Sequence, residues 1–208
     1  MIHFTTEQID NFEKRFRATF INSLSGFKSV ALIGTKSQSG DENVAIFSQI
    51  VHVGANPPLV GILFRPHTVI RHTLENILDT QVFTINHITE PIVSKAHHTS
   101  ARWDISEFEA CQLEPEYRHV IDAPYVKESA VQLGCKFVDK QNISINNTEF
   151  VIGQIVEVFL KEDIVSDDGY VNIEESNSLC SSGLDSYHST NKIARFGYAK
   201  PHRIPIEI

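Results

Sequence analysis

The chain has 208 residues, of which 41% are hydrophobic and 21% charged, a balance that predicts a packed globular protein and excludes a disordered one. Its formal net charge is -8, and its most basic run, Lys14 to Arg17, is typical of a solvated helix face, so no nucleic-acid partner is expected. No apolar run reaches about 18 residues and the charged first residues contain no apolar stretch, so we expect neither a membrane span nor a secretory signal.

The N-terminal third is predicted to form a helix followed by strands. Thr5 or Thr6 followed by Gln8 is a capping pattern, and apolar residues at spacings of three and four extend it into an amphipathic helix ending between Asn22 and Gly26. A glycine inside the third expected strand, Gly61, predicts the close approach of another backbone or of a ligand. The expected strands are 29–35, 44–53 and 59–64, joined by a hairpin turn at 36–42 and a Gly/Pro break at 54–58.

The rest of the chain is predicted to continue as strands with short helices at the periphery. Turn signals recur about every ten residues, which favours one mainly β domain over residues 1–208: an antiparallel β-barrel with an N-terminal helix and a C-terminal extension. The expected helices are 72–78, 91–98 and 103–110. The expected strands are 81–86, a hairpin of 130–138 and 149–160 with a turn at Asn146-Asn147, and a short strand near 164–171. The tail, residues 181–208, shows little periodicity.

Several familiar functional motifs are missing from the sequence. No GxGxxG follows a strand and no P-loop is present, which argues against a Rossmann domain or a P-loop NTPase. HExxH and GxSxG are also absent, and His87, His97 and His98 have no partner ligand at diagnostic spacing, so no metal site is expected. The three cysteines share no CxxC spacing, which predicts reduced thiols in the cytoplasm.

The expected strand 44–53 contains a polar interruption at Ser48-Gln49. It either leaves the core there, with both side chains in solvent, or it forms a barrel edge against which a ligand lies. In the second case the backbone N–H groups of Phe47, Ser48 and Gln49 could donate to a flat heterocycle, as unpaired strand edges do to a neighbouring strand.

A second polar group follows the strand that ends at residue 64. Arg65, Arg71, Thr73 and Asn76 supply two guanidinium groups, a hydroxyl and an amide within twelve residues, and the start of the expected helix adds backbone N–H groups. The pattern favours a phosphate site. The structural alternative is an i, i+4 pair of Arg71 with Glu75 and a capping role for Thr73.

A third group of donors, His97 to Arg102, follows the expected helix 91–98. It is equally compatible with ligand binding and with an ordinary helix C-terminus, where histidines interact well with the helix dipole.

These segments together resemble the flavin reductase-like, FMN-binding split-barrel family. The resemblance runs from about Ser29 to Tyr187 and depends on the order and spacing of many short pieces. They are Phe47-Ser48, Asn56–Gly61, Arg65-Pro66, Arg71-x-Thr73-x-x-Asn76-Ile77, Phe83–Asn86, His98–Ala101, Pro124–Ser129, Val151–Ile155 and Gly183–Tyr187.

The resemblance implies a cytoplasmic homodimer with a split barrel and non-covalent FMN, rather than FAD, near the subunit interface. It implies a reductase that takes hydride from NADH or NADPH and reduces a small-molecule acceptor, with no catalytic acid or base of its own. A flavin-binding electron carrier or sensor without turnover, or a barrel without flavin, are the alternatives. The implied cofactor-binding residues are Phe47, Ser48 and Gln49 at the flavin ring, Arg65, Pro66, Arg71, Thr73 and Asn76 around the ribityl-phosphate, and Asn86, His98 and Ser100 completing the pocket.

Overall fold

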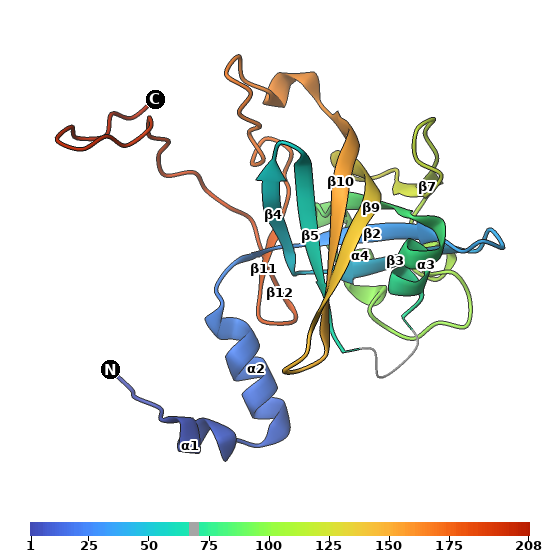
Figure 1. The fold of residues 1–208 in the computed structure, drawn as a ribbon, viewed down its shortest axis with the longest axis horizontal. Helices are drawn as coiled ribbons and strands as arrows, with labels where there is room; N and C mark the ends of the chain where they lie inside the picture. The colour runs from blue at the N-terminus through green and yellow to red at the C-terminus, as the bar shows by residue number, and fades with distance from the viewer. Residues whose placement is uncertain (67–70) are drawn as a thin grey trace.

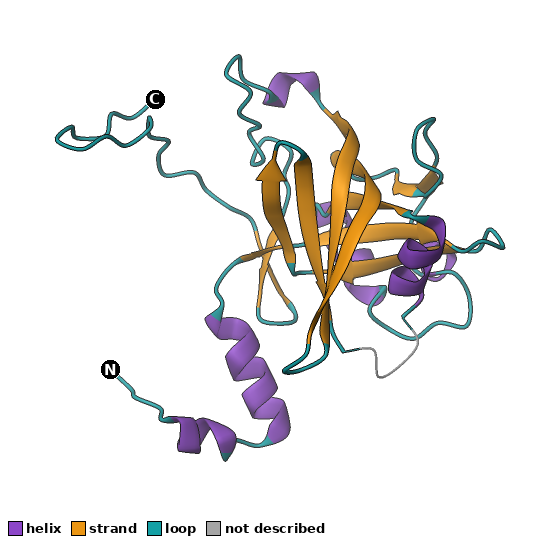
Figure 2. Ribbon diagram, in the orientation of Figure 1, coloured by secondary structure: helices purple, strands orange, loops and turns teal. Residues whose placement is uncertain are grey.

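The computed structural model describes residues 1–66 and 71–208, and its architecture confirms the mainly β prediction (Figures 1 and 2). A curled seven-stranded sheet forms the body, and short helices lie around it. The strands are β1 (Lys28–Ser29), β2 (Ala31–Lys36), β3 (Glu42–Phe47), β4 (Ile50–Ala55), β5 (Pro58–Phe64), β6 (Val82–His87), β7 (Pro115–Glu116), β8 (Tyr125–Val126), β9 (Val131–Ile143), β10 (Thr148–Leu160), β11 (Cys180–Ser182) and β12 (Ser186–His188).

The main sheet has the strand order β3-β2-β6-β9-β10-β5-β4, and every neighbouring pair is antiparallel. Its two edge strands, β3 and β4, are consecutive in the chain and are joined by Ser48 and Gln49 alone. The prediction of one continuous strand over 44–53 was therefore wrong. The chain bends at Ser48 because β3 pairs with β2 while β4 pairs with β5 at the opposite edge.

The predicted hairpin of two long strands is confirmed as β9 and β10, which pair from Ile143↔Thr148 to Val131↔Leu160 around the Asn146-Asn147 turn. Gly61 of β5 lies opposite Ile152 of β10, and a Cβ at residue 61 would come within 2.3 Å of the Phe150 ring. The close approach predicted at this glycine exists, and the Phe150 side chain makes it, rather than a backbone or a ligand.

Apolar residues of β2 alternate between two cores, one on each face of the sheet. Ile33 packs inside the barrel with Phe64, Phe83 and the α3 residues Leu74 and Ile77. The next residue, Leu32, packs on the other face, among Val44 of β3 and apolar residues of the segments 88–113 and 126. Both faces of this strand are buried, so its position is fixed from two sides.

The predicted helices 72–78 and 91–98 are present, whereas the predicted N-terminal helix is interrupted and the predicted helix 103–110 is shortened. Residues 11–13 interrupt the predicted N-terminal helix, residues 103–106 are not helical, and the tail contains the hairpin β11–β12 that its weak periodicity did not predict. The bounds are α1 (Thr6–Asp10), α2 (Lys14–Leu24), α3 (His72–Thr80), η1 (Glu90–Ile92), α4 (Val93–His98), α5 (Glu107–Ala110) and η2 (Glu162–Ile164).

The two ends of the chain extend away from the barrel, α1 and α2 on one path and residues 190–208 on another (Figure 1). Neither α1 nor α2 contains a buried residue, although Phe12, Phe16 and Phe20 contact one another with ring centroids 4.8–6.1 Å apart. Within the described ranges, no helix has the length and apolar character needed to cross a membrane.

Candidate functional site

Three groups of polar residues that are separate in the sequence meet at the split of the barrel, where the edge strands β3 and β4 are joined by Ser48 and Gln49. The Leu63 N–H donates to the Gln49 carbonyl at 3.0 Å, so the end of β5, and Arg65 just beyond it, lies beside the Ser48-Gln49 bend. The Ile46 N–H donates to Thr99 Oγ1 at 3.0 Å, which brings the end of α4 to the same part of β3. The structure therefore brings together the three segments that the sequence predicted as one site.

The bend between β3 and β4 leaves backbone donors unused. Neither the Ser48 nor the Gln49 N–H has a hydrogen-bond partner in the parts of the chain that the structure describes. Both residues are half-buried. The Phe47 ring packs against Phe64 in an edge-on contact, with centroids 4.7 Å apart, and so it fixes the strand just before the bend. Two consecutive free N–H groups at a partly shielded edge can donate hydrogen bonds to a ligand that has carbonyl or ring-nitrogen acceptors.

Arg65 and Arg71 concentrate positive charge near the bend. The Arg71 Nε and Nη2 atoms donate to the Pro66 carbonyl at 3.3 and 3.2 Å, which fixes the guanidinium and leaves three of its five N–H groups available. No carboxylate of the described chain lies within ion-pair distance of either arginine. Burial, and then the charge of Arg65, lower the pKa of Arg71, and burial followed by Arg65 likewise lowers that of Lys28. This repulsion between like charges would be relieved by a bound anion.

Thr73 and Asn76 belong to a buried network under the first turn of α3. Asn43 Nδ2 donates to Thr35 Oγ1 at 3.1 Å and to Thr73 Oγ1 at 3.0 Å, and Asn76 Nδ2 donates to Thr35 Oγ1 at 3.2 Å. The network connects α3 to the β2–β3 hairpin and so determines where the helix begins. Thr73 Oγ1 only accepts here, and its own proton has no acceptor among residues 1–66 and 71–208.

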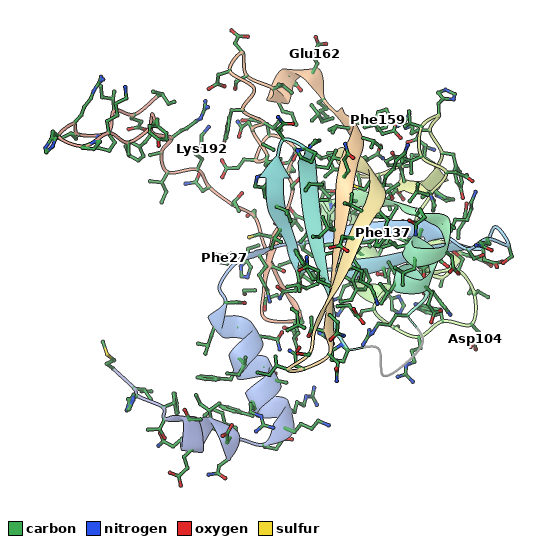
Figure 3. All side chains as sticks on the ribbon, in the orientation of Figure 1. Phe27, Asp104, Phe137, Phe159, Glu162 and Lys192 are labelled. Atoms are coloured by element: carbon green, nitrogen blue, oxygen red, sulfur yellow. The ribbon has the colours of Figure 1, made fainter. Side chains whose placement is uncertain are left out.

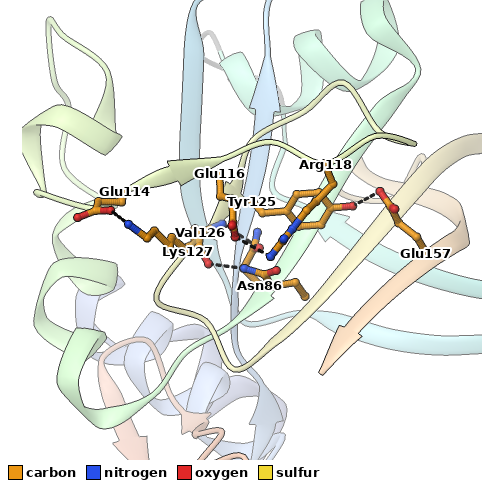
Figure 4. A network of polar contacts seen from close by, with 9 residues as sticks. Asn86, Glu114, Glu116, Arg118, Tyr125, Val126, Lys127 and Glu157 are labelled. Atoms are coloured by element: carbon orange, nitrogen blue, oxygen red, sulfur yellow. Dashed lines mark hydrogen bonds and ion pairs between the residues drawn. The ribbon is translucent and has the colours of Figure 1, made fainter. Parts of the chain in front are cut away.

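Asn86 is placed deeper than the resemblance implied, with no exposed surface. Its Nδ2 donates to the Leu32 carbonyl at 3.1 Å and to Thr84 Oγ1 at 2.9 Å. Its Oδ1 accepts from the N–H of Val126 at 3.0 Å, and Figure 4 shows these two residues. These bonds use both of its donors and connect β2, β6 and β8. The side chain works as a structural bridge, and its contact with a ligand stays a prediction.

The end of α4 combines one buried anchor with exposed groups. Thr99 is buried, donates to the Ala96 carbonyl at 2.8 Å and accepts from the Ile46 N–H. His98 and Ser100 are exposed; the His98 ring contacts Trp103 edge-on with centroids 4.7 Å apart, and Ser100 Oγ donates to the His97 carbonyl at 2.7 Å. Both side chains lie near β3, and their contact with a ligand stays a prediction.

Sequence reasoning missed Thr35, Asn43, Thr99 and Lys28. Thr35 and Asn43 are paired across the β2–β3 hairpin, so the predicted turn at 36–42 contained the signal that their side chains face each other. Thr99 lay inside the predicted donor segment but could not be distinguished from its exposed neighbours. Lys28, whose Nζ donates to the Asn22 and Gly183 carbonyls at 3.2 and 2.8 Å, depends on contacts too distant in sequence to predict.

The arrangement can bind a ligand with one anionic end and one flat, polar edge. Across the described ranges, no group of three or more His, Cys, Asp or Glu side chains is placed to hold a metal ion. All three cysteines are free thiols. The groups that the split offers to such a ligand are cationic side chains on one side and backbone donors on the other.

Comparisons with known proteins agree with this geometry. The flavin reductase like domain family matches residues 27–176. A solved structure from Shewanella frigidimarina NCIMB 400, a candidate flavin reductase with a split barrel domain, is 48% identical with a TM-score of 0.92, covering 96% of this chain and 100% of that one. Nitrilotriacetate monooxygenase component B from Bacillus cereus shares the fold, with a TM-score of 0.80 at 20% identity over 92% of this chain and 96% of its own. An uncharacterised protein of Aquifex aeolicus (strain VF5) is 26% identical over 152 residues, which cover 71% of this chain and 76% of its own.

The family match covers well over half of the chain, and the 48% identical structure extends over nearly all of it. The expected split barrel is thereby confirmed, and the family indicates flavin-related oxidoreductase function. The chain belongs to the flavin reductase like domain family and has its split-barrel fold.

Proposed function

We propose that the protein binds FMN non-covalently at the split of the barrel and acts as a NADH- or NADPH-dependent flavin reductase-like oxidoreductase. The observation that carries the proposal is the pair of arginines, Arg65 and Arg71, which have no carboxylate partner in the described chain and lie beside two free backbone donors. Cations held close together without counter-charge are costly unless a ligand supplies the anion.

The residues present fit a flavin mononucleotide. Arg65 and Arg71 suit its terminal phosphate, and Thr73 has a hydroxyl proton without an acceptor in the described chain. The Ser48 and Gln49 N–H groups suit the polar edge of the ring system. FMN is favoured over FAD because a terminal phosphate carries up to two charges on one group, matching two arginines, whereas FAD has an internal diphosphate with one charge on each phosphate.

When bound, FMN supplies the electron and hydride chemistry, and the chain binds and orients it. The Pro66 carbonyl holds the Arg71 guanidinium, the Asn43–Thr35–Asn76 network holds the start of α3, and Thr99 holds the end of α4 against β3. These contacts fix the groups that would surround the cofactor before it arrives, which reduces the ordering cost of binding. None of these groups has to act as an acid or a base.

A second candidate function is a flavin-binding electron carrier or sensor without nicotinamide turnover. The observation that favours it is the anchoring of α4 against β3 through Thr99, because a segment fixed beside the bend could cover one face of the flavin. On this alternative the cofactor binds in the same way, and a nicotinamide ring cannot reach it.

One anaerobic experiment separates the two functions. FMN-loaded protein is mixed with excess NADH or NADPH, and the flavin absorption band is followed. The reductase proposal expects the band to bleach with at least one of the two donors. Bleaching with dithionite alone would contradict it and favour the carrier or sensor, and a protein that neither carries flavin nor quenches the fluorescence of added FMN would contradict both.

We also propose a cytoplasmic homodimer. Large apolar side chains on the terminal segments are exposed, including Phe27 at 70%, Ile193 at 92% and Tyr198 at 93%. Residues 190–208 contain four Lys or Arg and one Glu, a net charge of +3. Because the whole chain has a net charge of -8, the remaining residues have a net charge of -11. A basic, apolar tail complements the acidic barrel of a second copy, and exposed apolar segments of this size usually mark an interface. The cytoplasmic location is supported by the three free thiols.

Sedimentation at micromolar concentration checks the dimer. The expected species has twice the chain mass of 23.4 kDa, and deletion of residues 190–208 weakens its association. A full-length protein that sediments as a 23.4 kDa monomer would contradict the proposal.

A further inference from the structure

A cavity of about 320 Å³ lies between the barrel and the segment 173–190. Apolar residues of β2, β4, β6 and β9 form most of its barrel wall, among them Ala31, Ile50 and Leu133. Phe27, labelled in Figure 3, also lines it and contacts His188 edge-on, with ring centroids 4.9 Å apart. The volume lies at the lower end of the range for small-molecule sites, and the walls are mainly apolar, as in such sites.

One titratable side chain in this wall is left with a free polar atom. His87, at the end of β6, lines the cavity, and its Nδ1 is 2.9 Å from Ser178 Oγ. Its Nε2 has no hydrogen-bond partner in the part of the chain that the structure describes. His87 is half-buried, and the described chain leaves this nitrogen unpaired at the cavity wall.

The hydrogen bonds behind His87 determine which of its nitrogens carries the proton. Ser176 Oγ donates to the Ile173 carbonyl at 2.6 Å, so its proton is committed. Ser178 Oγ, 2.6 Å from Ser176 Oγ, must then donate to it, and can only accept from His87. His87 Nδ1 is therefore the protonated nitrogen, and Nε2 is an acceptor.

The imidazole is neutral at physiological pH, because burial lowers the pKa of His87 to about 4. The cationic wall residue, Lys28, spends two of its three Nζ–H groups on backbone carbonyls, and a carboxylate has no proton to donate to His87 Nε2. The cavity thus has mainly apolar walls and one fixed acceptor.

We propose that this cavity binds a small, uncharged, mainly apolar molecule that donates a hydrogen bond through a hydroxyl or N–H group to His87 Nε2, as an aromatic alcohol of the phenol or naphthol class does. The apolar walls take up the ring, and an acceptor that the protein itself leaves unpaired selects for the donor. A ligand without a donor would cover Nε2 and leave it unsatisfied, which is the basis of strong discrimination between analogues.

The cavity lies close to the split of the barrel, but binding in it does not require flavin. Ala31 pairs with Phe47 across β2 and β3, and Ile50 follows directly after Gln49. A molecule in the cavity would lie next to the segment that we expect to face the cofactor. Its binding can be measured on the full-length protein as isolated, whether or not flavin is present.

Calorimetric titration with three matched naphthalenes tests the proposal. The probes are 2-naphthol, 2-methoxynaphthalene, which has the same ring system but no donor, and 2-naphthoate, which is anionic. The wild-type protein should bind 2-naphthol at least five-fold more tightly than 2-methoxynaphthalene and 2-naphthoate most weakly. In His87→Phe the preference for 2-naphthol should disappear, while the affinity for 2-methoxynaphthalene stays within about three-fold.

Thr190→Trp provides a second variant, because Thr190 lines the cavity yet is exposed and tolerates a larger side chain. It should weaken both uncharged probes alike, and it keeps the test decisive if His87→Phe does not fold. The proposal is overturned if wild-type protein binds no probe, if the naphthol and its ether bind equally, if naphthoate binds most tightly, or if the preference survives in a folded His87→Phe variant. It is equally overturned if Thr190→Trp leaves both affinities unchanged.

Discussion

Two sets of polar residues differ in whether the protein uses up their hydrogen bonds. The interior set, with Asn86 as its clearest member, makes its bonds to β2, β6 and β8 and has none left over. The surface set, Arg65 and Arg71 with the Ser48 and Gln49 N–H groups, keeps donors and charge without partners in the described chain. Thr73 belongs to both, since it accepts from Asn43 and keeps a free proton.

The difference teaches that residue type alone does not identify a ligand site. An amide in a buried, fully bonded position stabilises the scaffold, and an unpaired cation at the surface is available for binding. Substitutions in the interior set should therefore change the free energy of unfolding, and those in the surface set should change the dissociation constant of FMN.

The largest effect is expected for Asn86→Ala. The change leaves the Val126 N–H and the Leu32 carbonyl without the side chain that satisfies them, and should lower the free energy of unfolding by about 3 kcal/mol or more. Urea denaturation measures it, with Ser100→Ala as the exposed control, for which we expect less than about 0.5 kcal/mol. Equal stabilities of the two variants would show that Asn86 is not the bridge described.

The next effect concerns pH and His87, whose pKa burial lowers to about 4 from an ordinary value near 6.5. Between these values the unfolded chain binds a proton that the folded chain does not, so this contribution to stability is complete above pH 6.5 and is lost as the pH falls towards 4. Lowering the pH from 7 to 4 should cost wild-type protein about 2–3 kcal/mol more than it costs His87→Gln. Parallel pH profiles of the two proteins in urea denaturation would refute the shift.

Arg71→Ala should leave the fold nearly unchanged and weaken FMN binding by about 2 kcal/mol, or roughly 30-fold, through loss of one charge-assisted phosphate contact. Arg102→Ala is the matched control, because Arg102 is exposed and follows the exposed end of the α4 segment. Fluorescence quenching of FMN gives both dissociation constants. If the two variants bind FMN equally well, Arg71 does not belong to the phosphate site.

Thr73→Val should produce a small change in both quantities, because Thr73 lies between the two sets. It removes the acceptor for Asn43 Nδ2 and the free hydroxyl proton, so we expect about 1 kcal/mol of lost stability together with a few-fold weaker FMN binding. Loss of stability with unchanged affinity would assign Thr73 to the interior set alone.

Much of the barrel could be predicted from the sequence because its strands are apolar and its turns are marked. The hairpin β9–β10 and the strands β5 and β6 appeared near their predicted places. The single strand over 44–53 was a wrong prediction, because the pattern is apolar on both sides of Ser48 and only the pairing of β3 and β4 with opposite edges reveals the bend. The hairpin β11–β12 was missed because its few apolar residues depend on packing against β1 and α4.

The sequence predicted which segments form the site. It did not predict which of their side chains stabilise the fold and which remain available to a ligand. Arg71 and Asn76 are five residues apart and both looked suited to a phosphate, yet Asn76 is buried against Thr35 while Arg71 is half-buried and has N–H groups to spare. That distinction comes from the register of β2 and β3 under α3, a tertiary contact that spacing within α3 does not encode.

Comparison of FMN with riboflavin shows whether the surface set at the split of the barrel binds the phosphate of FMN. Riboflavin has the same ring and ribityl chain and lacks only the phosphate. Wild-type protein should bind FMN at least roughly 30-fold more tightly than riboflavin, and Arg71→Ala should reduce that ratio by about the same factor while leaving riboflavin affinity unchanged. Equal affinity of the wild-type protein for the two flavins would contradict the account.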